Sequence, residues 1–194
     1  MLKRRVLWLA AAALLGFGAW NLGHAAYIHA KALLAQRLLQ AAWAETQAGT
    51  PQAKPWPWAD TYPVARLTMP QRGVDLIVLA GASGRTMAFG PGHLDGTPLP
   101  GEAGNSVLSA HRDTHFAFLR HARPGEAFFV ENSSGKTTRF AVSEARVVDE
   151  RDLSVLRRTE SAQLTLVTCY PFDAIRPGGP LRYVVIARPA DAAS

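Results

Sequence analysis

The chain has 194 residues, of which 48% are hydrophobic and 19% are charged, so it has room for one soluble domain of about 100–150 residues plus a short appendage. Its net charge is +6, but Lys3, Arg4 and Arg5 supply half of that excess at the N-terminus. The other charges are mixed along the chain, a pattern that argues against a basic face for nucleic acid.

An apolar segment, residues 6–23, directly follows these basic residues. Its length is close to the roughly 17–25 residues that cross a bilayer as a helix, so residues 1–23 are predicted to be a cytoplasmic tip and a transmembrane anchor. Because Lys and Arg stay on the cytoplasmic side, the rest of the chain is expected on the opposite side. Small residues near Gly23 keep open the alternative of a cleaved signal peptide.

Residues 24–63 form the next segment. Between 25 and 47, apolar residues recur at helical spacing with polar residues between them, which predicts a helical stalk. Gly49 and four prolines then break regular structure up to Pro63, and Trp56 and Trp58 lie among them. This pattern predicts a linker that packs onto the following domain.

The folded domain is expected over residues 64–190. Short apolar segments separated by Gly, Pro and Asp predict seven strands, at 64–68, 74–80, 106–110, 126–131, 137–148, 163–169 and 182–188. Helical patterns are short, at 83–89, 114–121 and 152–158. The pattern predicts an all-β domain, an antiparallel barrel or sandwich, with an ordered loop over 90–105.

Three residues combine a reactive side chain with a place at a strand end. Cys169, the only cysteine, ends one predicted strand; His111 follows another; Arg182 opens the last. A thiol beside an imidazole is the nucleophile-and-base pair that a cysteine enzyme needs, and a guanidinium can stabilise an oxyanion. Arg176 is an alternative to Arg182, but it lies in a predicted turn. A free Cys is also often only a small buried hydrophobe.

A metal site is the competing interpretation of the same region. It would use His111, Asp113, His115 and Cys169, and the His pair has ligand spacing only if 111–115 is helical. No second cysteine completes such a site, so no metal or other cofactor is expected.

The segments TLVTC with Cys169, SAHRD with His111, and the downstream Arg182 resemble the sortases, and the similarity extends from about Ala65 to the last strand. The CYPF and GPGHLDGT segments look most like the Gram-negative class GN, near class D. The resemblance implies a closed eight-stranded β-barrel with short helices, anchored in the membrane, that cleaves an LPxTG-like C-terminal sorting signal and joins the new acyl end to an amine.

The resemblance also assigns roles. Cys169 would be the nucleophile, Arg182 would hold the oxyanion, and His111 would protonate the departing amine and deprotonate the incoming one. Thr168 matches the TLxTC pattern and is predicted to contact substrate, although it could equally be an ordinary strand threonine. Asp113 and His115 are predicted to contribute to substrate binding at the rim of the site, with loop capping as the alternative. Calcium sites of some sortases cannot be mapped onto this sequence, so calcium stays open.

The expected partners are a protein carrying the sorting signal and the inner (cytoplasmic) membrane, with the catalytic domain facing the periplasm and no nucleic acid. One alternative is a non-catalytic, membrane-tethered β-domain that binds an envelope protein through loop 90–105. Another is an L,D-transpeptidase, whose His-Gly and Ser-x-Gly-Cys segments are absent. The acceptor amine, the sorting motif and the oligomeric state are not predicted.

Overall fold

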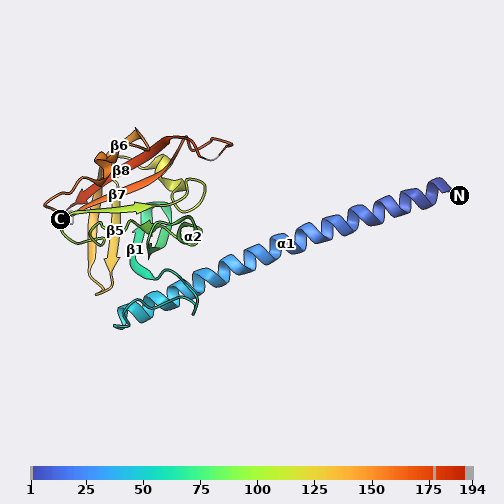
Figure 1. Ribbon diagram of the computed structural model, residues 1–194, viewed down its shortest axis with the longest axis horizontal. Coiled ribbons are helices and arrows are strands. Elements are labelled where there is room, and N and C mark those ends of the chain that lie inside the picture. Colours follow the sequence, from blue (N-terminus) through green and yellow to red (C-terminus); the bar gives the residue numbers. More distant parts are fainter. Residues whose placement is uncertain (1, 177, 191–194) are drawn as a thin grey trace. The chain divides into compact units, whose positions relative to one another are not determined.

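A computed structural model describes residues 2–176 and 178–190 (Figure 1). Contacts between residues divide the chain into two units, with the boundary between Arg37 and Leu38. A single helix, α1 (Leu2–Gln47), runs through this boundary. The end of α1 and the linker therefore belong to the same unit as the barrel.

The N-terminal part of α1 is long and apolar. It contains the one candidate membrane span of residues 2–176 and 178–190, with a mean hydropathy of 1.6 and none of that apolar window buried. By length and composition the helix can cross a bilayer, although a signal sequence near an N-terminus passes the same test. One continuous helix thus spans both the predicted anchor segment and the predicted helical stalk.

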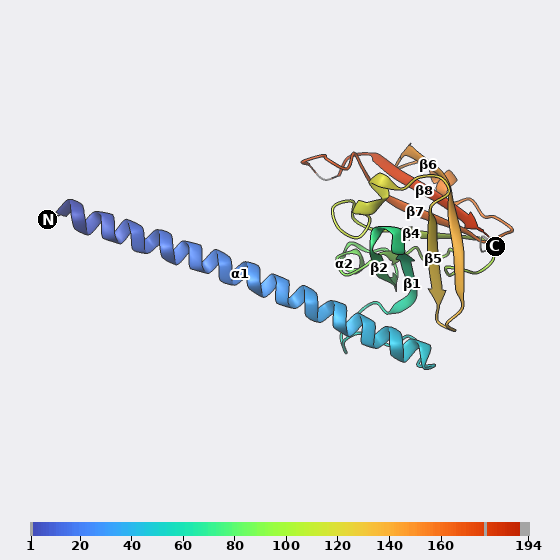
Figure 2. The ribbon, with the colours of Figure 1, turned by 180° about the vertical axis from the view of Figure 1, so that it is seen from behind.

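Eight strands form a closed barrel in the order β1-β2-β3-β4-β7-β8-β6-β5 (Figures 1 and 2). This confirms the predicted eight-stranded all-β barrel. The strands are β1 (Pro63–Met69), β2 (Val74–Ala80), β3 (Gly92–His93), β4 (Asn105–Ser109), β5 (Ala127–Asn132), β6 (Thr137–Asp149), β7 (Gln163–Tyr170) and β8 (Leu181–Pro189).

Strand pairing is antiparallel except at two places. β2 pairs with β3, and β4 pairs with β7, in parallel register. The barrel interior is filled by alternate residues of the strands, as β1 illustrates: Ala65, Leu67 and Met69 are fully buried, and the residues between them are half-exposed. Phe128 and Phe140 add the largest buried side chains of the neighbouring hairpin.

β3 is the one strand of the described barrel that the sequence did not predict. It lies inside the expected loop 90–105, which is otherwise ordered around His93. The His93 ring is buried, and its Nε2 is hydrogen bonded to the Pro98 carbonyl at 2.9 Å and to Thr97 Oγ1 at 3.0 Å. A strand of two residues is too short to show the alternating pattern by which strands are predicted.

Four short helices complete the unit: η1 (Pro70–Arg72), α2 (Gly84–Met87), η2 (Ala117–His121) and η3 (Leu153–Leu156). Asp152 caps η3, because its carboxylate accepts a hydrogen bond from the backbone N–H of Ser154 at 2.9 Å. The three predicted short helices overlap α2, η2 and η3. Of these helices, η3 lies in the connection between β6 and β7 that borders the site described below.

The last turns of α1 pack against β2. Leu39 and Trp43 are buried with Ile77 and Leu79 in a small hydrophobic cluster. The linker adds Trp56, whose ring makes an edge contact with a phenylalanine of the barrel unit, Phe89, at 5.0 Å between centroids. The linker therefore packs on the domain through Trp56, whereas Trp58 is 83% exposed.

Candidate active site

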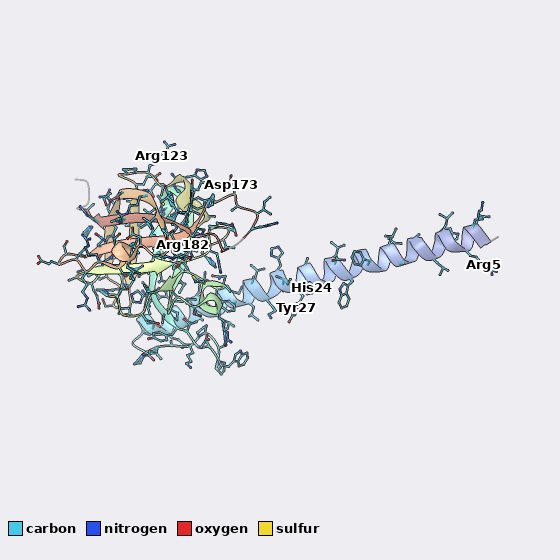
Figure 3. The ribbon with its side chains drawn as sticks, turned by 45° about the horizontal axis from the view of Figure 1, so that its top comes forward. Arg5, His24, Tyr27, Arg123, Asp173 and Arg182 are labelled. Carbon is cyan, nitrogen blue, oxygen red and sulfur yellow. The ribbon has the colours of Figure 1, made fainter. Side chains whose placement is uncertain are left out.

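Cys169 and Arg182 are direct partners across the antiparallel strands β7 and β8. Residues opposite each other in such a pair project from the same face, with Cβ atoms about 4.5–5.5 Å apart. The Cys169 thiol is free and half-buried. Figure 3 labels Arg182 within the barrel unit. The strand register therefore places Cys169 and Arg182 side by side on the same face of the barrel.

His111 joins this pair through the parallel pairing of β4 with β7. Ser109 and Val167 are partners in the register, and the backbone N–H of Ala110 continues the ladder by donating to the Val167 carbonyl at 3.3 Å. His111 and Cys169 each lie two residues beyond that pair. Their side chains consequently emerge at the same rim of the barrel, and His111 is exposed.

Thr168, next to Cys169, is buried and hydrogen bonded to the strand end that precedes His111. Its side chain is 2% exposed, and its hydroxyl donates a 2.7 Å hydrogen bond to the Ala110 carbonyl. Adjacent strand residues point to opposite faces, so Thr168 points inward where Cys169 points outward. The contact that the structure shows for Thr168 is thus with the backbone beside His111, and its predicted contact with substrate stays a prediction.

The guanidinium of Arg182 is held by three acceptors. Its Nη1 donates to the carbonyl oxygens of Gly179 at 2.6 Å and Leu181 at 2.9 Å, and its Nη2 donates to Glu150 Oε2 at 2.6 Å. The ion pair is partly exposed, at 26% for the Arg182 side chain and 45% for that of Glu150. No sequence pattern pointed to Glu150, because its partner Arg182 lies 32 positions further along the chain.

A groove of about 260 Å³ borders the same face of the barrel. The groove is lined by Val107 of β4, Val167 of β7, and Leu153 and Leu156 of η3. Arg182 lines the groove as well. Val167 precedes Cys169 by two residues on the same strand face, but Cys169 itself is not among the residues that line the groove.

Asp113 and His115 lie in the turn after His111. Asp113 is exposed and accepts a 3.3 Å hydrogen bond from Arg112 Nε. Burial lowers the pKa of His115 below its ordinary value; a hydrogen bond with the Ala88 backbone opposes this shift, and the charge of His111 adds to it. His115 therefore lies close enough to His111 for the two charges to repel, while its role in substrate binding stays a prediction.

Arg112 is a site-bordering residue that the sequence did not single out. Its side chain is only 6% exposed, and its Nη2 donates to the carbonyl oxygens of Ala174 at 2.7 Å and Arg176 at 3.4 Å. These carbonyls belong to the connection between β7 and β8, where Figure 3 labels Asp173. Arg112 thereby attaches this connection to the chain segment that carries His111.

The two alternatives left open by the sequence can be compared with this geometry. Arg176 is exposed and lies in the connection, whereas Arg182 is the arginine in register with Cys169. Residues 112–116 form turns, not a helix, so the His pair lacks the geometry that its ligand spacing requires. Within residues 2–176 and 178–190, no group of three or more His, Cys, Asp or Glu side chains is placed to hold a metal ion.

The structure thus brings Cys169, His111 and Arg182 to one rim of a closed eight-stranded barrel. The family model of the Sortase domain matches residues 67–190, and the chain belongs to the sortase family.

Individual relatives agree with this family. The chain is 30% identical over 123 residues to Sortase D of Bacillus subtilis (strain 168), a match that covers 63% of this chain and 61% of that protein. It is similar to the structure of sortase C-1 from Actinomyces oris, with 30% identity, a TM-score of 0.60 and coverage of 67% of this chain and 75% of that one.

A third similarity extends beyond the barrel core. Sortase A from Corynebacterium diphtheriae matches with 23% identity and a TM-score of 0.63 over 82% of this chain and 85% of that chain, which shows a shared fold. The matches thus include sortases named A, C and D. The family is shown, and the assignment to class GN near class D stays a prediction.

Proposed function

We propose that this chain is a membrane-anchored cysteine transpeptidase that cleaves an LPxTG-like C-terminal sorting signal and transfers the acyl group to an amine. The observation that carries the proposal is the cross-strand pair of Cys169 and Arg182, with His111 brought to the same rim by the pairing of β4 with β7. Membership of the sortase family supports the reaction type.

The first half-reaction forms a thioester. The Cys169 thiol gives its proton to His111, and the resulting thiolate attacks the carbonyl carbon of the Thr–Gly bond, so that the carbonyl oxygen becomes an oxyanion. The positively charged Arg182 guanidinium stabilises that oxyanion. The tetrahedral intermediate collapses as the C–N bond breaks, and His111 donates the proton that the departing amine needs.

The second half-reaction reverses these roles. An acceptor amine attacks the thioester carbonyl, and His111 removes a proton from the attacking nitrogen. Arg182 again stabilises the oxyanion. The C–S bond breaks, the Cys169 thiolate leaves, and a new amide is released. Both half-reactions use the same three side chains, so no further acid or base is required.

The groove supports an extended peptide as substrate. It passes Val107 and Val167 and is walled by Leu153 and Leu156, which offer apolar contacts for a leucine-like side chain. From Val167 the strand direction leads to Cys169. A peptide with its apolar side chain in the groove therefore presents a downstream carbonyl to the sulfur.

The helix α1 supports a membrane location for this activity. Its apolar segment follows Lys3, Arg4 and Arg5, which favour the cytoplasmic side. The barrel unit would then act on the other side of the inner membrane, in the periplasm, on a protein that carries the sorting signal.

Product analysis tests the proposal. The full-length protein in detergent micelles is incubated with an LPxTG-containing peptide and increasing concentrations of a primary amine. The expected products are the peptide cut between Thr and Gly and its amide with the added amine, the latter increasing with amine concentration. Cys169→Ala is expected to give neither product. An intact peptide with the wild-type chain, or equal products from the Ala variant, would contradict the proposal.

A further inference from the structure

Glu150 connects the β6–β7 segment, which walls the groove, to the start of β8. It is the first residue after β6. Its backbone N–H donates to the Pro180 carbonyl at 2.6 Å, and its carboxylate accepts from Arg182 Nη2 at the same distance. The Glu150 backbone thus binds the residue just before β8, and the Glu150 side chain binds Arg182 within β8.

The neighbouring carboxylates do not share this contact. Asp149 accepts the backbone N–H of Arg151 at 2.9 Å, and Asp152 accepts that of Ser154. These two side chains organise the turn in which they lie. Among the residues that the structure describes, Glu150 is the carboxylate that pairs with Arg182.

Glu150 determines how the guanidinium is oriented. The carbonyl oxygens of Gly179 and Leu181 both accept from Nη1, so they restrain only one of the three nitrogens of the planar guanidinium. Glu150 binds Nη2, and two restrained nitrogens define the orientation of the plane. Of the five guanidinium hydrogens, the bonds use both on Nη1 and one on Nη2. Within the described part of the chain, Nε–H and the second Nη2–H keep no protein acceptor.

We propose that Glu150 is a positioning residue of the transfer site: it fixes the Arg182 guanidinium beside Cys169 with Nε–H and one Nη2–H directed to the substrate oxyanion. The inference rests on the proposed function, because it assigns Arg182 to the oxyanion. Glu150 also lines the groove, but its carboxylate is bound to Arg182, and the apolar lining is supplied by other residues such as Val167 and Leu153. The loss of the Glu150 carboxylate is therefore expected to lower the rate of thioester formation more than it weakens peptide binding.

A matched control exists on another wall of the barrel. Arg72 Nη2 bonds Glu126 Oε1 at 2.6 Å and also the His121 carbonyl, and the two side chains are 24% and 26% exposed. Glu126→Gln therefore removes the same kind of carboxylate from the same kind of arginine. It lies next to β5, which is separated from β7 in the barrel by β6 and β8.

The kinetic test uses the full-length chain in detergent micelles and a quenched LPxTG-containing peptide. Glu150→Gln is expected to lower kcat roughly 10- to 100-fold with KM changed less than about twofold, because a small misorientation of a catalytic group has this effect. Glu126→Gln is expected to keep wild-type values. Adding Glu150→Gln to Arg182→Ala should cause no further loss. A wild-type kcat for Glu150→Gln would overturn the inference. So would a fold-loss of kcat caused by Glu150→Gln that is the same in the Arg182→Ala background as in the wild type.

A second measurement requires no turnover, which separates this inference from the proposed function. Nitrogen-15 NMR of the Arg182 guanidinium reports rotation about its Nε–Cζ bond. Slow rotation is expected in the wild type and in Glu126→Gln, and fast rotation in Glu150→Gln. Fast rotation in the wild type would overturn the positioning role even if the peptide were never cleaved. Slow rotation without any cleavage would support positioning and contradict the proposed function alone.

Discussion

The Thr168 hydroxyl donates a 2.7 Å hydrogen bond to the carbonyl oxygen of Ala110, the residue immediately before His111. The donor precedes Cys169 by one position. A buried side chain thus ties together the two strand ends that carry the thiol and the imidazole. The bond gives a physical reason for a threonine next to the nucleophile, independent of any contact with substrate.

Replacing Thr168 with Val is expected to lower the free energy of unfolding by about 1–3 kcal/mol, because the Ala110 carbonyl loses a buried partner. The rate of peptide cleavage should also fall, since the loop that bears His111 is less well held. Denaturant unfolding and peptide cleavage measure the two effects.

Thr61→Val is the control for this variant, since Thr61 is also a buried residue and its hydroxyl donates to the Ala80 carbonyl at 2.7 Å. It should destabilise the fold to a similar degree without slowing cleavage. Equal loss of cleavage in both variants would show that Thr168 contributes only to stability.

Replacing Arg112 with Gln is expected to loosen the connection between β7 and β8. The shorter side chain cannot reach the carbonyl oxygens of Ala174 and Arg176, so these two oxygens lose their protein donor and must be hydrogen bonded by water instead. Backbone amides over residues 172–176 should exchange hydrogen faster than in the wild type.

Hydrogen exchange followed by mass spectrometry measures this change. Arg66→Gln, which removes an exposed ion pair with Asp75 on β1 and β2, should leave exchange in this connection unaltered. Unchanged exchange in the Arg112 variant would mean that the connection is ordered by other contacts.

The lowered pKa of His115 predicts a pH dependence of stability. Burial is its main cause, so the folded state binds the proton less readily than the unfolded state. The stabilising contribution is therefore present above the unfolded pKa, about 6.5, and is lost as the pH falls through the lower folded pKa.

Urea unfolding between about pH 7.5 and about pH 5 tests this expectation. The free energy of unfolding should fall less on acidification in His115→Asn than in the wild type. His111→Gln should raise the pKa of His115 in an NMR titration, because the repelling charge is removed. A His115 pKa above its ordinary value would contradict the burial seen in the structure.

The end of α1 is expected to contribute to the stability of the barrel unit. Leu39 is fully buried against β2 residues, so Leu39→Ala should cost about 2–5 kcal/mol in the free energy of unfolding. Leu33→Ala on the same helix, at a position that is 65% exposed, should change it by less than about 0.5 kcal/mol. Similar values for the two variants would indicate that the helix end does not pack on β2.

Much of the fold follows from local patterns in the sequence. Seven strands were predicted close to their observed ends, because a barrel strand alternates between a buried and an exposed face, as in β1. The strand β3 was not predicted, because two residues are too few to show an alternation of apolar and polar side chains. The division between Arg37 and Leu38 was also not predicted, since it depends on where α1 begins to pack.

The site was predictable in part, for a related physical reason. Cys169, His111 and Arg182 each combine a reactive side chain with a strand end, and both features are visible along the chain. Glu150 and Arg112 act through partners far away in sequence, with Arg182 in one case and carbonyl oxygens in the other. Backbone acceptors have no sequence signature, so only the folded geometry identifies these residues.

The central claim is that the Cys169 sulfur forms an acyl-enzyme at the rim shared with His111 and Arg182. Intact-mass spectrometry of the full-length protein after brief exposure to an LPxTG-containing peptide tests this most directly. The expected result is a mass increase equal to the peptide fragment ending in Thr less one water, carried on Cys169, removed by hydroxylamine and absent from Cys169→Ala. An adduct on another residue, or one that persists in the Ala variant, would contradict the account.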